Sequence, residues 1–522
     1  MTDAKAWLAR WWVPILFLVC QLPFLLQPLG GLHKWRQADT AAVARNLAFE
    51  AADPFHPRID MRGDRSGITG MEFPLYQSMV AAGLATVGDR DAVGKFVSLL
   101  AALAAGASLA ALLVRRLKVD RTSAFAAIAL SPLLFHYAAK VMPETTALAL
   151  ACVALERTDA WIAGRRIRDL ALASATLALA ALVRPYVVFA GAPLLLAWVS
   201  GCANRSEEPG HRRLFGWDAA LAGILAALPF LLWFYLWCPH LVRTYGIDYF
   251  FTGNSLRKNL AAMGEFRFWS LLLSTLGQHV VNWIALPVFL LGAWQAFRLR
   301  RAGQFATPSW WLVLGIPGFA IPALLLLIGA HFSPHNYYFL VLVAPVAAVV
   351  AIGLHTLRER WPKAMLVLLP LLLVGSALQW SHTWRSDRGW RAYDELLSAG
   401  GVPDQQLVAV ENLGHLAWHL HPLHARGWVV SRPGLRDPAT LSRLRQAGMQ
   451  WIVITDESGV YRLYDAGTWQ KSLGLNATSS PMDGVFPPLT GAPTPGAPPH
   501  RAAVPAPPAA PGSSPATTSA AR

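Results

Sequence analysis

A short polar stretch holds the side chains of this sequence that are best suited to proton transfer. It covers residues 33–47, directly after the first apolar run, and contains Arg36 and Asp39. Helical spacing would put Arg45 and Asn46 on the Asp39 side, so we expect a short helix with this carboxylate in its first turn. A carboxylate so placed can accept a proton from an attacking group. The alternative is that Asp39 only caps the helix.

Cations and a further acid stand at the ends of later apolar runs. Arg184 lies in a Val-Arg-Pro-Tyr turn at the expected membrane face, where its guanidinium could bind a lipid phosphate or merely anchor the span. Lys140 and Glu144 share the segment Lys-Val-Met-Pro-Glu. Pro143 makes a plain helix start the alternative for Glu144.

The turn at 331–338 contains His335 and Tyr337, which are available to a phosphate or a sugar. An interfacial aromatic belt explains Tyr337 almost as well. His331 and His335 are four residues apart, but Pro334 disfavours a helix through both, so we do not expect a two-histidine metal face.

Two other clusters have tempting spacing but weak context. The histidines at 415, 419, 421 and 424 lack supporting acids or cysteines, and Asp89-Arg90-Asp91 is expected to be a solvated turn. The metal site is therefore unknown. A divalent cation is the one cofactor that the sequence leaves open.

The composition shows what must position these groups. Of 522 residues, 54% are hydrophobic and only 14% are charged, against roughly 25% in soluble domains. We therefore expect a mostly helical, polytopic membrane protein. About eleven apolar runs are long enough to cross a bilayer in a packed bundle. They lie at 11–29, 93–114, 122–138, 145–160, 169–183, 186–200, 217–237, 270–296, 309–330, 336–354 and 364–380.

Basic residues orient these spans. The formal net charge is +15, and alternate loops concentrate Arg and Lys near residues 115–121, 165–168, 205–213, 298–301 and 358–363. The positive-inside rule places these loops and the N-terminus in the cytoplasm, with the first run as an uncleaved signal anchor. This pattern accounts for the charge without nucleic acid. The protein is expected to be a multi-pass protein of the cell inner membrane.

The intervening loops are external in this topology and hold the candidate chemistry. The long loop 30–92 ends in an expected interfacial helix at 72–88, and the loop 238–269 could close as a lid over a substrate. After residue 380, short β-like runs (406–410, 427–430, 451–455) and helix-like runs (390–398, 439–447) predict an external α/β domain over 381–486. Residues 487–522 are rich in Pro and Ala and are expected to be disordered.

These features together resemble glycosyltransferase family 39. The shared features are an Asp in a short helix after the first span, a Pro-Leu-Tyr helix ending the first loop, an Arg-rich cytoplasmic loop, a late His/Tyr turn and a small external domain. The family, which includes protein O-mannosyltransferases and an aminoarabinose transferase of lipid A, belongs to the C-type glycosyltransferases. The resemblance covers about residues 8–380 and implies a C-type membrane domain over 1–380.

The resemblance also implies an activity and roles for individual residues. Family members move a sugar from a polyprenyl phosphate to an acceptor outside the cytoplasm, with inversion. By position Asp39 matches the family's catalytic acid, and Glu144 is similar to a second acid facing it. The departing phosphate would then be held near Arg184, Lys140 and His335.

Three further residues would take part in binding the donor. Tyr337 accompanies His335 in the late turn, Arg36 stands in the stretch 33–47, and Glu72 precedes the Pro-Leu-Tyr helix. Glu72 departs from the aminoarabinose transferases, which place a Lys before this Pro-Leu-Tyr helix. Thr40 also stands where many members have Glu.

Two other classes of function remain as alternatives. A transporter or flippase of a lipid-linked saccharide would place ionisable residues in mid-span and show two related halves, neither of which is visible here. A ligase that moves a whole glycan from a lipid pyrophosphate is chemically closer. The acceptor can be a glycolipid, a protein or a polysaccharide.

Overall fold

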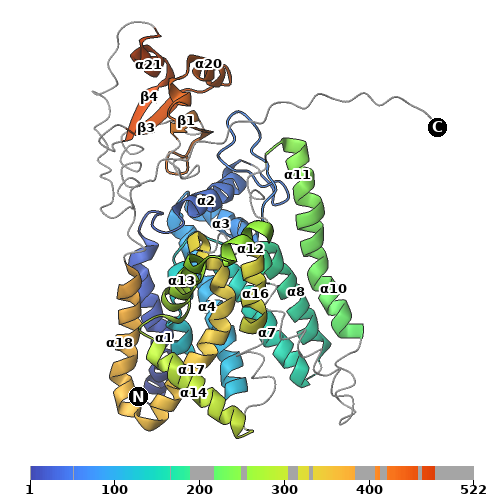
Figure 1. Ribbon diagram of the computed structural model, residues 1–522, viewed down its shortest axis with the longest axis vertical. Coiled ribbons are helices and arrows are strands. Elements are labelled where there is room, and N and C mark those ends of the chain that lie inside the picture. The colour runs from blue at the N-terminus through green and yellow to red at the C-terminus, as the bar shows by residue number, and fades with distance from the viewer. Residues whose placement is uncertain are drawn as a thin grey trace, which may run out of the picture.

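The protein is a helical bundle with a small sheet domain at one end (Figure 1). The structure is a computed structural model of the chain. It describes residues 2–50, 52–164, 166–187, 217–247, 256–303, 316–328, 333–381, 406–411, 420–455 and 461–475. The expected tail at 487–522 and the expected helix at 390–398 lie outside these residues.

The helices of the N-terminal half build one side of the bundle and the first loop. They are α1 (Thr2–Leu25), α2 (Lys34–Phe49), α3 (Leu75–Val87), α4 (Asp91–Leu117), α5 (Arg121–Ala129), α6 (Pro132–Tyr137), α7 (Glu144–Gly164) and α8 (Ile167–Val183). The interfacial helix expected at 72–88 is observed as α3. Whether it lies on a membrane surface stays a prediction.

The helices of the second half complete the bundle. They are α10 (Trp217–Leu231), η3 (Leu232–Trp237), α11 (Cys238–Tyr245), α12 (Leu256–Met263), α13 (Phe266–Thr275), η4 (Leu276–Val281), α14 (Leu286–Arg301), α16 (Ile316–Ile328), η7 (Ser333–Leu342), α17 (Val343–Arg360) and α18 (Pro362–Ser381). Alanine-rich faces of α4, α7 and α17 let these helices pack closely in one large apolar core.

Four described helical segments are long and apolar enough to cross a membrane, or five if one bent pair counts as a span. The four are Asp91–Leu117, Leu221–Tyr245, His335–Arg360 and Pro362–Gln379. The expected number of about eleven is therefore not confirmed. The expected run at 186–200 lies almost wholly outside the described residues, and of the run at 309–330 the structure describes α16.

Two runs that we expected to be single spans are broken. The run 122–138 divides into α5 and α6, because Ser131 caps the second helix and Pro132 begins it. The run 270–296 bends by 89° between η4 and α14. The bend lies at Asn282, which has a φ of 73° and donates a hydrogen bond to Ser376 at 2.6 Å.

The C-terminal domain is a four-stranded sheet with the strand order β2-β1-β3-β4. The strands are β1 (Leu407–Glu411), β2 (Arg426–Val430), β3 (Trp451–Thr455) and β4 (Tyr461–Asp465). Between β2 and β3 lie η9 (Gly434–Arg436) and α20 (Pro438–Gln446), and β4 is followed by α21 (Ala466–Gln470) and η10 (Lys471–Leu475). β1 pairs in parallel with β2 and β3, and β4 is antiparallel to β3. Three strands match the expected runs, whereas β4 was not expected.

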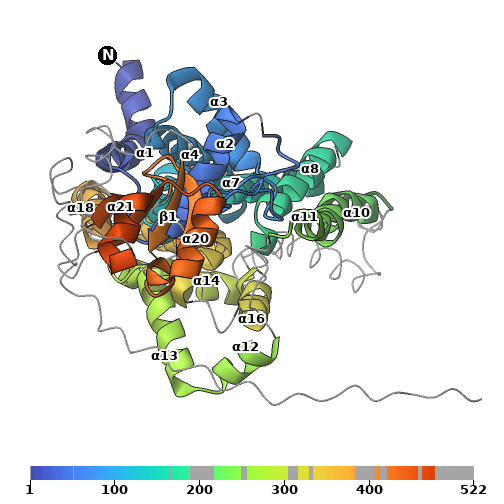
Figure 2. The ribbon, with the colours of Figure 1, turned by 90° about the horizontal axis from the view of Figure 1, so that it is seen from above.

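The two faces of this sheet pack against different partners. Val408, Val410 and Val453 pack on the first loop and α2, whereas Ala409 and Ile452 on the other face pack on α20 and α21. This alternation follows the period of two along a strand. Seen from above, the sheet with α20 and α21 lies over the bundle (Figure 2).

Polar contacts fix the same junction between the sheet and the first loop. Gly427 exchanges backbone hydrogen bonds with Asp60 and Gly63, at 3.0 and 2.8 Å. His421 lies 3.0 Å from an oxygen of Asp91. Asp89 and Arg90 are exposed, as expected of a solvated turn, whereas Asp91 is half-buried and takes part in the docking of the sheet.

Candidate functional site

Helix α2 brings the first candidate acid into the interior. The helix begins at Lys34, after His33 in a left-handed conformation with a φ of 62°, and has no acid in its first turn. Asp39 lies in the second turn with 6% of its surface exposed. Both expectations for Asp39, a place in the first turn and a capping role, are therefore wrong. Arg36 lies three residues earlier and hence on the same side of the helix.

Four predicted residues meet in one group, which we call the arginine–glutamate cluster: Arg36, Glu72, Glu144 and Arg184. Arg36 forms an ion pair with Glu72, and Arg184 forms one with Glu144. The Arg184 guanidinium also lies 3.7 Å from Glu72. All four side chains are at most 10% exposed.

The four residues come from different segments, so only the fold brings them together. Arg36 is in α2, Glu72 precedes α3, Glu144 is the first residue of α7 and Arg184 follows the end of α8. Glu144 thus does begin a helix, as the alternative supposed, but it also binds Arg184. Arg184 is paired with acids and is not a free anchor at a membrane surface.

The electrostatics of the cluster keep its first pair ionised. Burial would raise the pKa of Glu72, but the positive charges of Arg36 and Arg184 outweigh this effect and hold the pKa below its ordinary value. Burial likewise opposes the charge of Arg36, and Glu72 reverses the effect and raises the pKa of Arg36. Arg36 and Glu72 are therefore both charged in a dry environment.

Several buried polar atoms of this region have no hydrogen-bond partner within the described part of the chain. They are Oε2 of Glu144, Nε of Arg184 and the hydroxyl of Tyr186. Buried polar atoms in folded proteins are nearly always hydrogen-bonded, so each exception needs an explanation. Atoms of a bound substrate would supply the missing partners.

A second group of polar side chains adjoins the cluster and was missed by sequence reasoning. The side-chain oxygen of Asn336 accepts from Tyr137 at 2.6 Å and is 3.0 Å from a ring nitrogen of His33. The Asn336 amide nitrogen lies 2.9 Å from His279. His279 stands in η4, inside an apolar run, and a lone histidine in such a run was its only signal.

His335 and Tyr337 join the two groups, as their shared turn suggested. The Tyr337 hydroxyl lies 3.0 Å from Nδ1 of His335, and the guanidinium carbon of Arg184 lies 5.6 Å from the centre of the Tyr337 ring. His33 and His335 are stacked, with ring centres 6.4 Å apart. His331 lies outside the described residues.

Lys140 has a different place from the one predicted. Its ammonium group donates to the carbonyl oxygen of Gly30 at 2.9 Å, and Lys95 donates nearby to the carbonyl oxygen of Phe24 at 3.0 Å. Burial lowers the pKa of Lys140 to about 7. Its ammonium therefore binds the chain after α1 instead of joining the arginine–glutamate cluster.

Two other expectations bear on this end of the molecule. Of the loop 238–269, α11 and α12 are described, whereas residues 248–255, the centre of the expected lid, lie outside the described residues. Among the residues that the structure describes, no group of three or more His, Cys, Asp and Glu side chains could hold a metal ion.

Comparison with known proteins identifies the fold. No protein-family model and no curated protein matches the chain. ArnT from Cupriavidus metallidurans in the apo state matches with a TM-score of 0.54 at 15% identity, covering 82% of this chain and 86% of ArnT. The same protein bound to undecaprenyl phosphate matches with a TM-score of 0.54 at 14% identity, covering 84% and 89%.

A second kind of enzyme has the same architecture. The archaeal oligosaccharyltransferase AglB from Archaeoglobus fulgidus, in complex with an inhibitory peptide and a dolichol-phosphate, matches with a TM-score of 0.50 at 12% identity, covering 86% of this chain and 70% of AglB. Identities this low establish the fold alone. The expected C-type glycosyltransferase fold is confirmed, whereas the expected number of spans is not.

Proposed function

We propose that this protein is an inverting glycosyltransferase that moves a sugar from a polyprenyl-phosphate donor to an acceptor on the periplasmic side of the inner membrane. The observation that carries the proposal is the buried arginine–glutamate cluster with its unpartnered polar atoms. The structural neighbours add that proteins of this fold bind undecaprenyl phosphate and dolichol-phosphate. Assignment to family 39 is part of the proposal.

In the proposed reaction the bond between the sugar C1 and the phosphate oxygen breaks as the acceptor oxygen or nitrogen attacks C1 from the opposite face. Asp39 accepts the acceptor's proton. Negative charge grows on the departing phosphate oxygen, and Arg184 and Arg36 stabilise it in a site from which water is excluded. The leaving group is the polyprenyl phosphate.

The acids of the cluster prepare the arginines for this task. Glu72 and Glu144 balance the two positive charges while no substrate is bound, which offsets the cost of burying them. The unpartnered Nε of Arg184 can then donate to a phosphate oxygen. His335 and Tyr337 lie beside Arg184 and would contact the phosphate or the sugar.

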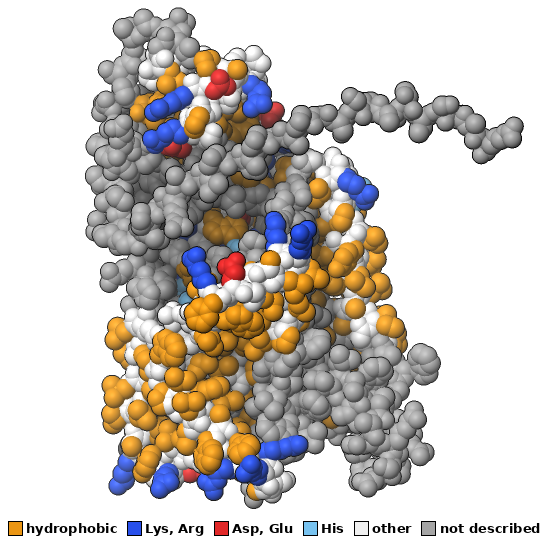
Figure 3. All heavy atoms as spheres, viewed as in Figure 1, with side chains coloured by type: hydrophobic (Ala, Val, Ile, Leu, Met, Phe, Trp, Pro, Cys, Tyr) orange, Lys and Arg blue, Asp and Glu red, His pale blue; other side chains and the backbone are white. Residues whose placement is uncertain are grey.

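The proposed orientation rests on the distribution of charge. Basic residues end α4, α14 and α17: Arg115, Arg116, Arg298, Arg300, Arg301, Arg358 and Arg360. Lys and Arg gather at the end of the bundle far from the sheet, below an apolar belt (Figure 3). The positive-inside rule puts this end and the N-terminus in the cytoplasm, and the sheet domain, residues 381–486, in the periplasm.

The test does not need the identity of the sugar. Lipid extracts of cells with the wild-type gene, without it, and with Asp39→Asn are compared by mass spectrometry for polyprenyl-phosphate-linked species. We expect one such species to accumulate in the second and third strains, because its consumption stops. If the polyprenyl-phosphate-linked lipids are unchanged in both strains, the protein does not use a donor of this class.

A binding measurement complements this test. Undecaprenyl phosphate added to the purified protein in detergent should raise its melting temperature, and the rise should be lost in Arg184→Gln. Arg443→Gln, at an exposed position on α20, is the matched control. If undecaprenyl phosphate raises the melting temperature of all three proteins equally, its binding does not depend on the arginine–glutamate cluster.

Transfer of a whole oligosaccharide is a second candidate, favoured by the match to AglB. Mass spectrometry distinguishes the two, because the accumulating lipid would then carry several sugars. A flippase would leave the same lipid intact but trapped on the cytoplasmic face, where an externally added periodate reagent cannot oxidise it.

A further inference from the structure

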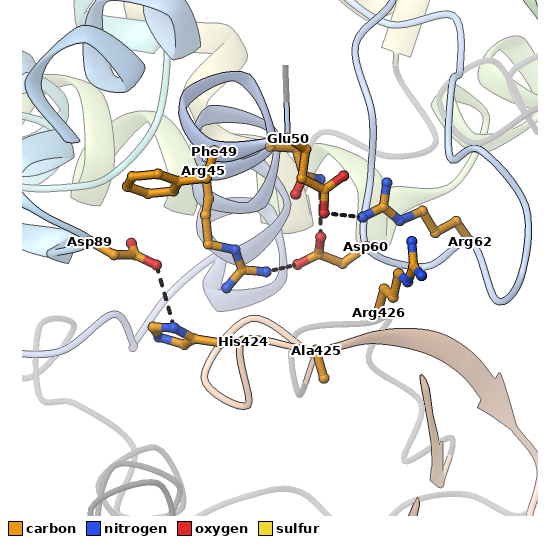
Figure 4. Close-up of a pocket in the computed structure, with 10 residues that line it drawn as sticks. Arg45, Phe49, Glu50, Asp60, Arg62, Asp89, His424, Ala425 and Arg426 are labelled. Atoms are coloured by element: carbon orange, nitrogen blue, oxygen red, sulfur yellow. Dashed lines mark hydrogen bonds and ion pairs between the residues drawn. The ribbon is translucent and has the colours of Figure 1, made fainter. Parts of the chain in front are cut away.

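A second polar cavity lies away from the arginine–glutamate cluster. Its volume is about 250 Å³, and it is enclosed by the end of α2, the loop at 60–62 and the start of β2 (Figure 4). It contains none of the four cluster residues. Its walls therefore come from the first loop and from the sheet domain, two regions far apart in the sequence.

Hydrogen bonds across the domain junction hold these walls in place. The guanidinium of Arg45 donates to the carbonyl oxygen of His421 at 3.2 Å, and Gly427 bonds to Asp60 and Gly63 through its backbone. Gly427 has no room for a side chain, because an added Cβ would lie 1.7 Å from the carbonyl oxygen of Val408. The cavity is thus a fixed feature of how the sheet docks.

The acids of the cavity are already paired. Asp60 lies 2.5 Å from Arg45, and Glu50 lies 2.5 Å from Arg62. His424 lies 3.4 Å from Asp89. The Arg45–Asp60 and Arg62–Glu50 pairs neutralise the charges on the walls that α2 and the loop contribute, and Figure 4 shows both pairs and the His424–Asp89 contact around the cavity.

Arg426 lines the same cavity but takes part in none of these ion pairs. No hydrogen bond or ion pair of its side chain is found within the described ranges, and its Nε is buried, as is the unpartnered Nε of Arg62. A partly buried guanidinium without a counter-ion is costly, because its planar donors need anionic oxygens at fixed positions. A phosphate or carboxylate matches this geometry.

The rest of the lining suits a single sugar ring. Phe49 is 49% exposed and lines the cavity together with the polar residues Asn46 and Asp60. A few polar groups around an apolar surface are typical of sites for small ligands. The volume falls just below the ~300 Å³ at which pockets for drug-sized molecules begin, so one ring fits and an oligosaccharide does not.

We propose that this cavity binds a sugar that carries an anionic group, with Arg426 holding the phosphate or carboxylate and Phe49 lying against the ring. Asn46 stands two turns after Asp39 on the same face of α2, roughly 10 Å along the helix. A molecule bound in the cavity reaches Asp39 only through a further group that extends beyond the bound ring over this distance. Identifying that molecule as the acceptor rests on the proposed function, whereas binding itself does not.

The experiment measures binding to the full-length protein in detergent by calorimetry. The probes are glucose 1-phosphate and glucuronate, with glucose and inorganic phosphate as comparisons. We expect both anionic sugars to bind at least tenfold more tightly than glucose, and glucose 1-phosphate more tightly than phosphate. Arg426→Gln should raise both dissociation constants at least tenfold, and the exposed control Arg443→Gln should leave them unchanged.

Three results would overturn the proposal: equal binding of glucose, equal binding of inorganic phosphate, or equal effects of Arg426→Gln and Arg443→Gln. If Arg426→Gln does not fold, Phe49→Ala tests the ring contact at a half-exposed position. This substitution should weaken the binding of glucose 1-phosphate but not that of inorganic phosphate. Equal effects on the two dissociation constants would contradict the site. If the protein binds these probes but its loss leaves the lipid-linked donors of the cell unchanged, the binding proposal stands and the proposed function is wrong.

Discussion

Helix α7 carries two groups of charged residues, one near each end, and they differ in almost every physical respect. At its start, Glu144 belongs to the arginine–glutamate cluster and is fully buried. Near its end, Glu156 and Asp159 bind Arg115, and Arg157 binds Asp169. We call this second group the far-end cluster.

The arginines of the far-end cluster reach solvent, and its acids are satisfied. Arg115 is 43% exposed and Arg157 35%, and both oxygens of Glu156 and of Asp159 have arginine partners. In the arginine–glutamate cluster the charges are dry and several polar atoms lack partners. The same residue types thus form fully paired, partly exposed contacts at one end and a buried group with unpartnered atoms at the other.

The largest effect is expected for Arg184→Met. Removing this cation leaves Glu144 and part of Glu72 as uncompensated buried charges, which should lower the free energy of unfolding by about 3–5 kcal/mol. The double variant Arg184→Met with Glu144→Gln should recover most of that stability but no transfer. Unfolding in detergent and the lipid assay measure the two effects. If the double variant transfers sugar, the arginine–glutamate cluster stabilises the fold, as the far-end cluster does, and has no role in the reaction.

The next effect is expected for Asp39→Asn. Loss of a general base costs about 10²–10⁴-fold in rate, whereas the isosteric amide should leave the melting temperature almost unchanged. The rate is measured with membranes and the donor lipid found by mass spectrometry. Glu265→Gln, at an exposed position, is the control. If both variants transfer at the wild-type rate, Asp39 has no part in catalysis.

Acid should weaken the end that contains His33. Burial lowers the pKa of His33 to about 3, so between pH 6.5 and 3 the unfolded chain binds a proton that the folded protein excludes. Stability contributed by the neutral ring is complete above pH 6.5 and falls as the pH drops, by at most ~1.4 kcal/mol per unit. Melting curves at pH 7 and 5 should differ less for His33→Gln than for wild type and for Arg115→Ala. Equal slopes for all three would contradict a neutral, buried His33.

The smallest effect is expected at the far end. Arg115→Ala removes a cation that is 43% exposed, and exposed ion pairs contribute only ~0.2–1 kcal/mol. Transfer should stay at the wild-type level, because no substrate group is proposed there. A loss of transfer with intact folding would erase the distinction between the two clusters.

Much of this contrast could be predicted from local sequence. Arg184 and Glu144 were chosen because they are ionisable residues at the ends of apolar runs, which are costly unless they have partners, whereas Arg36 and Glu72 followed from the family resemblance. Their mutual pairing could not be predicted, since it depends on how four segments meet. Lys140 had the same signal as Arg184, yet its ammonium binds the carbonyl of Gly30.

The errors in the fold have similar causes. Hydropathy sums over a run and does not detect a break inside it, so the cap at Ser131 and the bend at Asn282 were missed. β4 is as short as the other three strands but lacks their apolar run, and its pairing with β3 fixes it more than its own pattern does. His33 and His279 became functional candidates only when Asn336 was seen to join them.

The docking of the sheet on α2 also has a consequence for biosynthesis. Arg45 precedes its partner His421 by 376 residues, which is roughly 20–75 s of translation at 5–20 residues per second. Throughout that interval the apolar surface of α2 and the first loop, including Ala41 and Tyr76, lacks the strands that later cover it. The wall of the candidate sugar cavity that the sheet domain contributes is therefore synthesised long after the wall that α2 contributes. Chains that end before residue 420 lack the sheet-domain wall.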